Sequence, residues 1–205
     1  MFLLGHTSGD TPVAWDPERD PNLLLSGKCA SGKTASLVAL TRQAAAAGWA
    51  VAGLASPRER LLWDLPGAVA FGTGEEFLGF LKALPEHRRK TLSLPPRPLL
   101  LVLDGGDALL TGRVGAKIAK HLVAATARSA TSGIQLAIAL QGTDVLHRLA
   151  PQLVAHLSAQ VDCLANSPLP ATGSTTQPCY EQVLTCPSLA EAITYRPLDP
   201  TALSR

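Results

Sequence analysis

Aromatic residues, net charge and long apolar runs are all scarce in this sequence of 205 residues. Aromatic side chains make up only 4% of the chain, so it offers no stacking platform for single-stranded nucleic acid. The formal net charge of +2 is too small to indicate a nucleic-acid partner, and any basic surface has to be local. No apolar run approaches the roughly 18 residues of a membrane span, and the apolar start Met1–Leu4 is broken too soon for a signal peptide. We therefore expect a cytoplasmic protein without direct membrane insertion.

The four cysteines lack the spacing of a zinc or redox pair, because none of them forms a CxxC motif. They are Cys29, Cys163, Cys179 and Cys186. Cys179 and Cys186 are close enough in the chain for a flexible hairpin to bridge, but free thiols are the expected state in a reducing compartment.

The composition is that of a globular chain, with 46% hydrophobic and 17% charged residues, and the length suits one domain with one core. Short apolar runs alternate with helix-forming stretches along most of it. The expected strands cover residues 22–26, 49–55, 68–71, 99–103, 134–140 and 160–164. The expected helices cover residues 33–47, 75–84, 114–129 and 144–157. This alternation predicts a single α/β domain over residues 1–205, with a mainly parallel central sheet flanked by helices.

Three segments have the composition of irregular structure. Residues 11–21 are rich in proline and acidic residues and are expected to be a turn-filled lead-in. Residues 85–98 contain four prolines and the basic cluster His87–Lys90, which predicts a loop. Residues 166–205 are expected to be a loop-rich tail after a core of about residues 5–165, and residues 180–197 within the tail suit an edge hairpin.

The motif with the most specific chemistry is GKCASGKT at residues 27–34, which fits GxxxxGK[ST] and lies directly between an apolar strand and a helix. We expect Gly27 to open a phosphate-binding loop. The amides of Ala30, Ser31 and Gly32 would then face the β-phosphate, because unsatisfied N–H groups and the helix dipole both favour an anion there. The alternative interpretation is a glycine-rich turn without a ligand.

Two side chains at the end of this loop complete the expected contacts with the nucleotide. Lys33 would reach the β- and γ-phosphates as a point charge, and the hydroxyl of Thr34 would bind Mg²⁺. The motif therefore predicts that ATP or a similar nucleoside triphosphate binds together with Mg²⁺.

Two further polar residues follow apolar strands. Asp104 ends the run PLLLVLD, which places a carboxylate at the edge of the sheet where ligands bind in open α/β folds. It is the candidate for the magnesium-side acid, although an aspartate before Gly105 is also ordinary turn chemistry. Gln141 follows the strand 134–140, which would lie between the strands 22–26 and 99–103. It would then be near the γ-phosphate and could orient water or report the nucleotide state. A loop glutamine without such a role is the alternative.

Four segments in this order resemble the FtsK/SpoIIIE ATPase family, within the FtsK/HerA superfamily. They are Gly9-Asp10 with Pro12-Val13 ahead of Asp16, then DPNLLLSGKCASGKT, LLLVLDGGDALL and GIQLAIALQGTD. The likeness covers roughly residues 5–165, and its most specific part is the lead-in PVxWDPxxDPNLLL. The family includes bacterial DNA translocases, conjugative-transfer proteins and EccC-type secretion ATPases.

This resemblance implies a RecA-like P-loop NTPase core that works as a ring, usually a hexamer, and converts ATP hydrolysis into movement of double-stranded DNA or of a polypeptide. It assigns the phosphate-loop roles to Lys33 and Thr34, the magnesium-side acid to Asp104 and the sensor to Gln141. Those assignments match the roles expected from the residues themselves.

The sequence departs from the family pattern at two of these motifs. Gly105 replaces the acid that usually polarises the attacking water, and Gly142 replaces an arginine that often follows the sensor glutamine. Without that acid, hydrolysis is affected more than binding, because the water still has to be oriented. Asp107 could substitute for it or could cap the following helix.

The sequence leaves the transported polymer open. Basic residues gather at His87–Lys90 with Arg97, and at Arg113, Lys117, Lys120 and Arg128 on one expected helical face. That face suits a double-stranded DNA backbone or is merely solvated. The first hypothesis is an ATP-hydrolysing FtsK-like motor on double-stranded DNA. The second is a hydrolysis-weakened nucleotide-binding module that assists a partner ATPase, including an EccC-like secretion ATPase. A P-loop kinase is a third, disfavoured by the arginine-poor stretch after Gln141.

Overall fold

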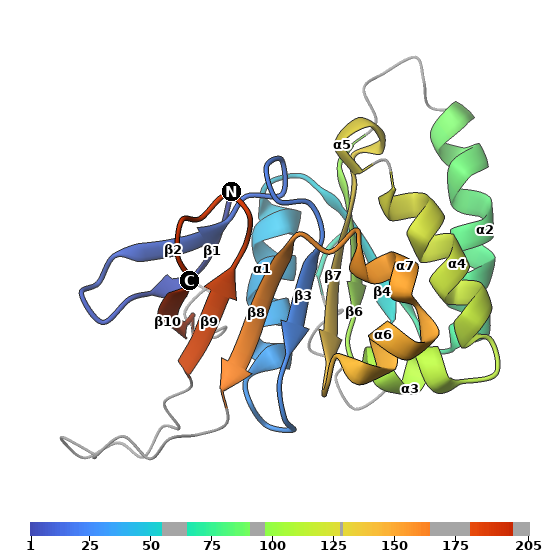
Figure 1. Ribbon diagram of the computed structural model, residues 1–205. Coiled ribbons are helices and arrows are strands. Elements are labelled where there is room, and N and C mark those ends of the chain that lie inside the picture. The colour runs from blue at the N-terminus through green and yellow to red at the C-terminus, as the bar shows by residue number, and fades with distance from the viewer. Residues whose placement is uncertain (55–64, 91–96, 128, 165–180, 199–205) are drawn as a thin grey trace.

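The computed structural model describes residues 1–54, 65–90, 97–127, 129–164 and 181–198, and within these ranges ten strands form one mixed sheet (Figure 1). The strands stand in the order β2-β1-β10-β9-β8-β3-β7-β6-β4-β5. Their bounds are β1 Phe2–His6, β2 Pro12–Trp15, β3 Leu23–Ser26, β4 Ala50–Leu54, β5 Ala68–Phe71, β6 Leu99–Leu103, β7 Ile134–Leu140, β8 Ala159–Leu164, β9 Glu181–Thr185 and β10 Ile193–Pro197. The helices are α1 Lys33–Ala46, α2 Gly74–Lys90, α3 Gly106–Thr111, α4 Gly115–Thr126, α5 Ser129–Ser132, α6 Asp144–Leu149 and α7 Pro151–Val154.

The strands from β8 to β5 run parallel and form the centre of the fold. β7 pairs with β3 on one side and with β6 on the other, as the sequence predicted. The carboxyl ends of these parallel strands therefore meet at one edge of the sheet, and the phosphate-loop motif, Asp104 and Gln141 all follow strands that end there. The predicted α/β class with a mainly parallel central sheet is confirmed.

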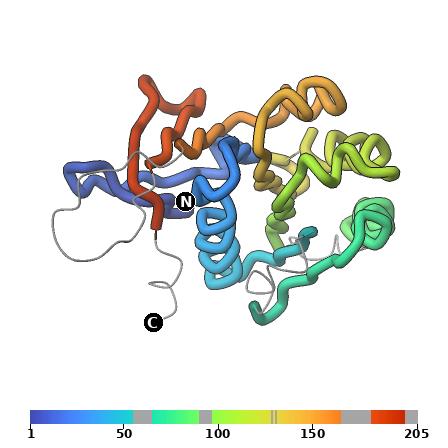
Figure 2. The backbone as a smooth tube through the Cα atoms, turned by 90° about the horizontal axis from the view of Figure 1, so that it is seen from below, coloured from blue at the N-terminus to red at the C-terminus, as the bar shows by residue number. Residues whose placement is uncertain are grey.

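Helices cover both faces of the sheet (Figures 1 and 2). α1 packs on one face against Leu23 and Leu25 of β3, whereas α2, α3, α4, α6 and α7 pack on the other face, where Leu24 points. The central strands β6 and β7 are buried along their whole length, because each is covered from both sides. The unbroken apolar runs in the sequence thus have a direct physical cause.

The expected lead-in at residues 11–21 is wrong for its first half. Pro12–Trp15 forms β2, which pairs antiparallel with β1. Val13 and Trp15 both point into the core and are almost fully buried. The indole N–H of Trp15 donates to the carbonyl of Asp20 at 2.6 Å. Proline is tolerated at Pro12 because it is the first residue of a strand at the sheet edge.

The expected loop at residues 85–98 is wrong for its first six residues. α2 continues through Pro85 to Lys90, so the basic cluster His87–Lys90 forms the last turns of a helix. Proline lacks the N–H that would donate to the carbonyl of residue 81. The buried apolar face that includes Phe77 and Leu81 continues to Leu84, one residue before the proline, and this packing holds the helix together.

Proline divides another expected helix. The segment 144–157 splits into α6, which ends at Leu149, and α7, which begins at Pro151. Proline suits the first turn of a helix, where its missing N–H has no intrahelical partner. The expected helix 114–129 is also found as two helices within the described residues, although no proline lies there. α4 ends at Thr126, and α5 begins at Ser129.

The chain after residue 180 returns to the middle of the sheet. β9 pairs antiparallel with β8, and β10 joins β9 to β1. This hairpin therefore lies inside the sheet rather than at an edge, and its residues Gln182, Leu184 and Tyr195 are almost fully buried. Residues 165–180, with Cys179, lie outside the described residues. Cys29, Cys163 and Cys186 are free thiols, as expected.

Candidate nucleotide-binding site

The motif at residues 27–34 forms a tight loop between β3 and α1. Gly27 has φ of 148°, and a Cβ atom there would lie 2.4 Å from the carbonyl oxygen of Cys163. Ala30 and Gly32 also have positive φ, and Gly32 caps α1 without any side-chain hydrogen bond to the first turn. The loop is therefore built so that backbone, rather than side chains, lines the start of α1, where an anion is favoured.

Lys33 folds back over this loop. Its Nζ atom donates to the carbonyls of Gly27 at 2.7 Å and Lys28 at 2.6 Å, and to the hydroxyl of Ser31 at 3.3 Å. All three acceptors belong to the loop itself, and no carboxylate is among them. Among the residues that the structure describes, no carboxylate pairs with this positive charge, which leaves it available to a phosphate at the loop.

Thr34 and Asp104 meet although they are 70 residues apart in the sequence. The Thr34 hydroxyl donates to Oδ2 of Asp104 at 2.8 Å, and the other carboxylate oxygen accepts the backbone N–H of Gly105 at 2.9 Å. A hydroxyl and a carboxylate oxygen are hard oxygen ligands of the kind that Mg²⁺ takes beside phosphates. The chemistry of this pair therefore fits the metal that the sequence motif predicts.

Gln141 lies one strand away, directly after β7. Its backbone N–H donates to Oδ2 of Asp107 at 2.7 Å. With Gly142 and Thr143 it lines one side of a cavity of about 370 Å³ that extends to Gly27. The structure thus brings Gln141 to the same edge as the loop and Asp104.

The other side of this cavity contains residues that sequence reasoning missed. Asp162 of β8 accepts hydrogen bonds from the hydroxyl of Ser26 and from the side-chain amide of Gln160, the latter at 2.8 Å. The alternation along AQVDCL was the available signal, because it puts Gln160 and Asp162 on one face while Val161 and Cys163 face the core. Nothing local in the sequence indicates the contact with Ser26.

The Cys163 thiol lies beneath the loop, close to Ser31 and Lys33. Burial raises its pKa to about 12, although the charge of Lys33 acts in the opposite direction. The thiol is therefore neutral near pH 7 and serves as an apolar support for the loop.

The turn after Asp104 is made by two glycines with different constraints. Gly105 has φ of 66° and begins α3, and a Cβ atom there would meet nothing within 4 Å. A Cβ atom on Gly106 would lie 2.7 Å from Leu140 and 3.0 Å from Ile138, so α3 starts in direct contact with β7. Asp107 does not cap α3 through its side chain, since its carboxylate accepts the amide of Gln141 instead.

A buried polar cluster ties α1 to the strands β9 and β10. Gln182 accepts hydrogen bonds from Ser36 at 3.1 Å and from the Tyr195 hydroxyl at 2.8 Å, and its amide nitrogen donates to Ser36 at 2.9 Å. Burial raises the pKa of Tyr195, which keeps this hydroxyl protonated. Ser36 is only two residues beyond Thr34, so this cluster supports the first turn of the phosphate-loop helix.

The basic residues that the sequence grouped as possible DNA contacts are separated in the structure. Arg113 precedes α4 rather than lying on it and forms an ion pair with Glu75 at the start of α2, which corrects the expected helical face. Lys117 and Lys120 are exposed on α4, and residue 128 lies outside the described residues. The cluster His87–Lys90 ends α2 at the edge opposite to the phosphate loop (Figure 1).

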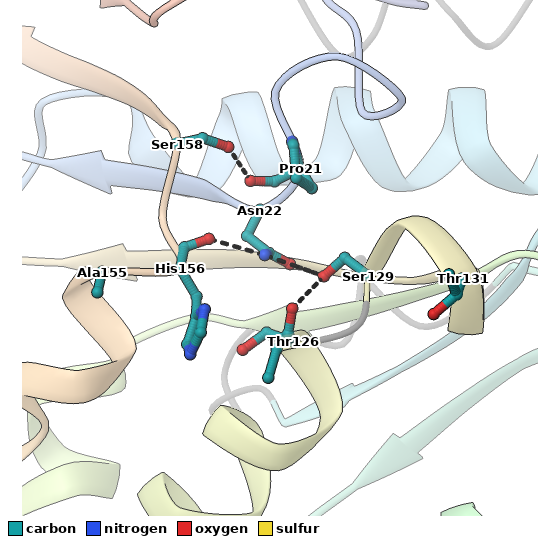
Figure 3. A pocket seen from close by; sticks show the side chains of 9 residues that line it. Pro21, Asn22, Thr126, Ser129, Thr131, Ala155, His156 and Ser158 are labelled. Atoms are coloured by element: carbon teal, nitrogen blue, oxygen red, sulfur yellow. Dashed lines mark hydrogen bonds between the residues drawn. The ribbon is translucent and has the colours of Figure 1, made fainter.

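A second cavity, of about 440 Å³, lies at the amino ends of β3, β7 and β8 (Figure 3). Asn22, with φ of 64°, donates to the carbonyl of His156 at 2.8 Å and to Ser129 at 3.1 Å, and it accepts the amide of Leu136 at 2.9 Å. Since these bonds fasten three segments together, we interpret Asn22 as a structural residue. This cavity is far from the phosphate loop, at the opposite edge of the sheet.

Comparison with solved structures finds a similar fold in several ATPase and NTPase structures. The pCW3 conjugation coupling protein TcpA, in its monomer form with ATPγS, has a TM-score of 0.70 at 14% identity over 98% of this chain and 68% of its own. The cytoplasmic domain of the type VII secretion ATPase EccC of Thermomonospora curvata has a TM-score of 0.71 at 15% identity, over 97% of this chain and 26% of its own. The genome packaging NTPase B204 of Sulfolobus turreted icosahedral virus 2, with AMPPCP, has a TM-score of 0.58 at 13% identity, over 89% of this chain and 100% of its own.

These likenesses show the fold, and the chain spans about a quarter of the EccC structure that it matches. Comparison with family models and with curated proteins finds no match for the sequence. Among the described residues, no helix has both the length and the apolar character needed to cross a bilayer. The resemblance inferred from sequence, to conjugative-transfer and EccC-type ATPase domains, is confirmed at the level of fold.

Proposed function

We propose that this chain is a single motor-type ATPase domain that binds ATP with Mg²⁺ and acts on double-stranded DNA. The observation that carries the proposal is the contact of Thr34 with Asp104 at 2.8 Å, beside a lysine that donates to loop oxygens and, within the described part of the chain, to no carboxylate. A hydroxyl, a carboxylate and an ammonium group in this arrangement match the needs of a magnesium-bound triphosphate. The amides of Ala30, Ser31 and Gly32 supply the remaining phosphate contacts.

Each residue has a separate role in this proposal. Lys33 places positive charge beside the β- and γ-phosphates, Thr34 and Asp104 hold the metal-side oxygens, and Gln141 orients water or responds to the γ-phosphate. Mg²⁺ supplies charge neutralisation at the phosphates when it is bound. The protein's contribution is to fix these groups at one edge of a rigid parallel sheet.

Double-stranded DNA is the polymer that we propose first. Two of the similar structures are a conjugation coupling protein and a genome packaging NTPase, which supports a nucleic acid as the transported polymer. The proposal also includes a ring of several copies, usually six, in the cytoplasm.

One observation favours a second function, that of a hydrolysis-weakened module assisting a larger ATPase. The position after Asp104 is Gly105, which has no carboxylate to polarise water. EccC, a secretion ATPase, is among the similar structures, and one of these structures contains a signal sequence peptide. In this second function the chain would bind ATP but depend on a partner for turnover or transport.

Binding is tested with Lys33→Ala, and Lys28→Ala serves as the matched control. Both variants remove one positive charge from the same loop, but the Lys33 ammonium donates to loop carbonyls, whereas Lys28 is exposed and accepts through its backbone carbonyl. We expect Lys33→Ala to abolish binding of a fluorescent ATP analogue and Lys28→Ala to change the affinity by less than about fivefold. Equal affinities in the two variants would refute the assignment of the loop.

Turnover is tested by steady-state ATP hydrolysis with and without long double-stranded DNA, with Lys33→Ala as the blank. DNA-stimulated hydrolysis that disappears in this variant supports the motor function. Tight ATP binding without turnover in either condition refutes an autonomous motor and favours the assisting module. Light scattering with an ATP analogue present tests the ring, because a chain that stays monomeric under these conditions contradicts it.

A further inference from the structure

Asp104 and Asp107, which flank the start of α3, contact different partners. Asp104 contacts Thr34, whereas Asp107 accepts the backbone N–H of Gln141 at 2.7 Å. Asp107 and Gln141 are 34 residues apart, and they meet because β6 and β7 are adjacent parallel strands that end at the same edge. One short turn thus links the metal side of the site to the residue after β7.

The two glycines between these carboxylates make the second contact geometrically feasible. Gly105 takes the left-handed conformation that turns the chain sharply after β6. A Cβ atom on Gly106 would lie 2.7 Å from the Leu140 side chain and 3.0 Å from that of Ile138, so Gly106 packs closely on the end of β7. The first turn of α3 is therefore close enough to the end of β7 for a short aspartate side chain to reach the first amide beyond it.

The orientation of the Gln141 backbone amide sets the direction of the Gln141 side chain. Gln141 is exposed and follows a strand that is buried along its whole length, so its backbone is where the rigid sheet gives way to a loop. A hydrogen bond from this amide to an oxygen of Asp107 fixes the orientation of the amide. The Asp107 carboxylate therefore fixes the backbone of Gln141, and with it the direction in which the Gln141 side chain leaves the backbone.

We propose that Asp107 is a positioning residue that holds Gln141 at the γ-phosphate end of the nucleotide, rather than the base that activates water. This inference rests on the proposed ATPase function. The carboxylate is engaged with the Gln141 amide, and the contact needs only an acceptor oxygen at this place. Hence a neutral amide oxygen can serve in its stead, which a general base cannot allow.

Three variants separate the two roles: Asp107→Ala, Asp107→Asn and, as a matched control, Asp144→Ala. Asp144 lies in the first turn of α6, close in sequence to Gln141, and is exposed. We expect Asp107→Ala to lower kcat about tenfold with little change in KM, and Asp107→Asn to stay within about threefold of the unmodified chain. Asp144→Ala should leave kcat unchanged within the same margin. A kcat in Asp107→Asn as low as in Asp107→Ala would overturn the proposal.

The contact between Asp107 and Gln141 can also be measured without ATP hydrolysis. This measurement separates the inference from the proposed function. Hydrogen exchange at the Gln141 amide should speed up at least about tenfold in Asp107→Ala but not in Asp107→Asn. The affinity for ATPγS should be the same in both variants, since neither touches the loop at residues 27–34. If the unmodified chain binds ATPγS without hydrolysing any ATP, the exchange result still decides the case: unchanged exchange in Asp107→Ala would overturn the positioning role.

Discussion

The replacement of Gln182 by alanine should destabilise the whole domain, because its side chain is fully buried and satisfies two hydroxyl groups. The Tyr195 hydroxyl and the Ser36 hydroxyl both donate to its carbonyl oxygen, and its amide donates back to Ser36. In Gln182→Ala both hydroxyls lose this partner in a region closed to water. The effect should reach α1, since Ser36 belongs to its first turns.

The magnitude follows from the number of groups left without a partner. Each buried polar group that loses its hydrogen bond costs about 1–3 kcal/mol, so the two hydroxyls together give about 2–6 kcal/mol. The cavity left by the shortened side chain adds to this value. We therefore expect the free energy of unfolding to fall by about 4 kcal/mol, and the melting temperature of a chain of this size to fall by about 8–16 °C.

Urea unfolding followed by circular dichroism measures this change. The midpoint should shift to lower urea while the m-value stays the same, because the amount of surface exposed on unfolding hardly changes. Tyr195→Phe is the matched variant: it removes one donor but leaves Gln182 bonded to Ser36, so it should cost only about 1–2 kcal/mol. A loss below about 1 kcal/mol in Gln182→Ala would refute the reasoning, since it would mean that β9 and β10 are not part of the cooperative fold.

Three further outcomes are expected from the same structure. Asp104→Ala should abolish the magnesium dependence of nucleotide binding in calorimetric titrations, because it removes the carboxylate beside Thr34; an unchanged dependence would contradict its assignment. Gly105→Ala should cost about 1–2 kcal/mol in urea unfolding, owing to its positive φ rather than to a clash, and Gly105→Asn should cost less; equal costs would contradict this cause. At pH 8, Cys29 should react with a thiol reagent and Cys163 should not, since Cys29 is exposed while burial raises the pKa of Cys163 to about 12; ATP should slow the reaction of Cys29, and an unchanged rate would place the nucleotide elsewhere.

Local patterns were sufficient to predict the centre of the fold. The apolar runs at β3, β6 and β7 have no alternation because both faces of these strands are covered, and this property is visible in the sequence. The spacing of the motif at residues 27–34 fixed the loop between a strand and a helix. The sequence thus predicted which residues would meet at one edge, including Asp104 and Gln141.

The wrong or missing predictions concern features that depend on contacts between segments far apart in the sequence. The residues of α2 up to Leu84 pack in the apolar core and the helix continues past Pro85, and local propensity cannot register this packing. β2 is only four residues long, and its strand character depends on pairing with β1. The bond of Gln182 to Ser36 spans 146 residues, so no short window of sequence contains both partners.

Asp107 was only partly predictable. The sequence showed its position close to Asp104, but not its contact with Gln141. The lack of an acid at Gly105 first suggests a simple loss of function, yet the same glycine supplies the left-handed turn that starts α3. A glutamate at this position would introduce a side chain where φ is 66°, and that strain would act on the turn that brings Asp107 to Gln141. The left-handed turn at Gly105 and the contact of Asp107 with Gln141 are therefore parts of one local geometry.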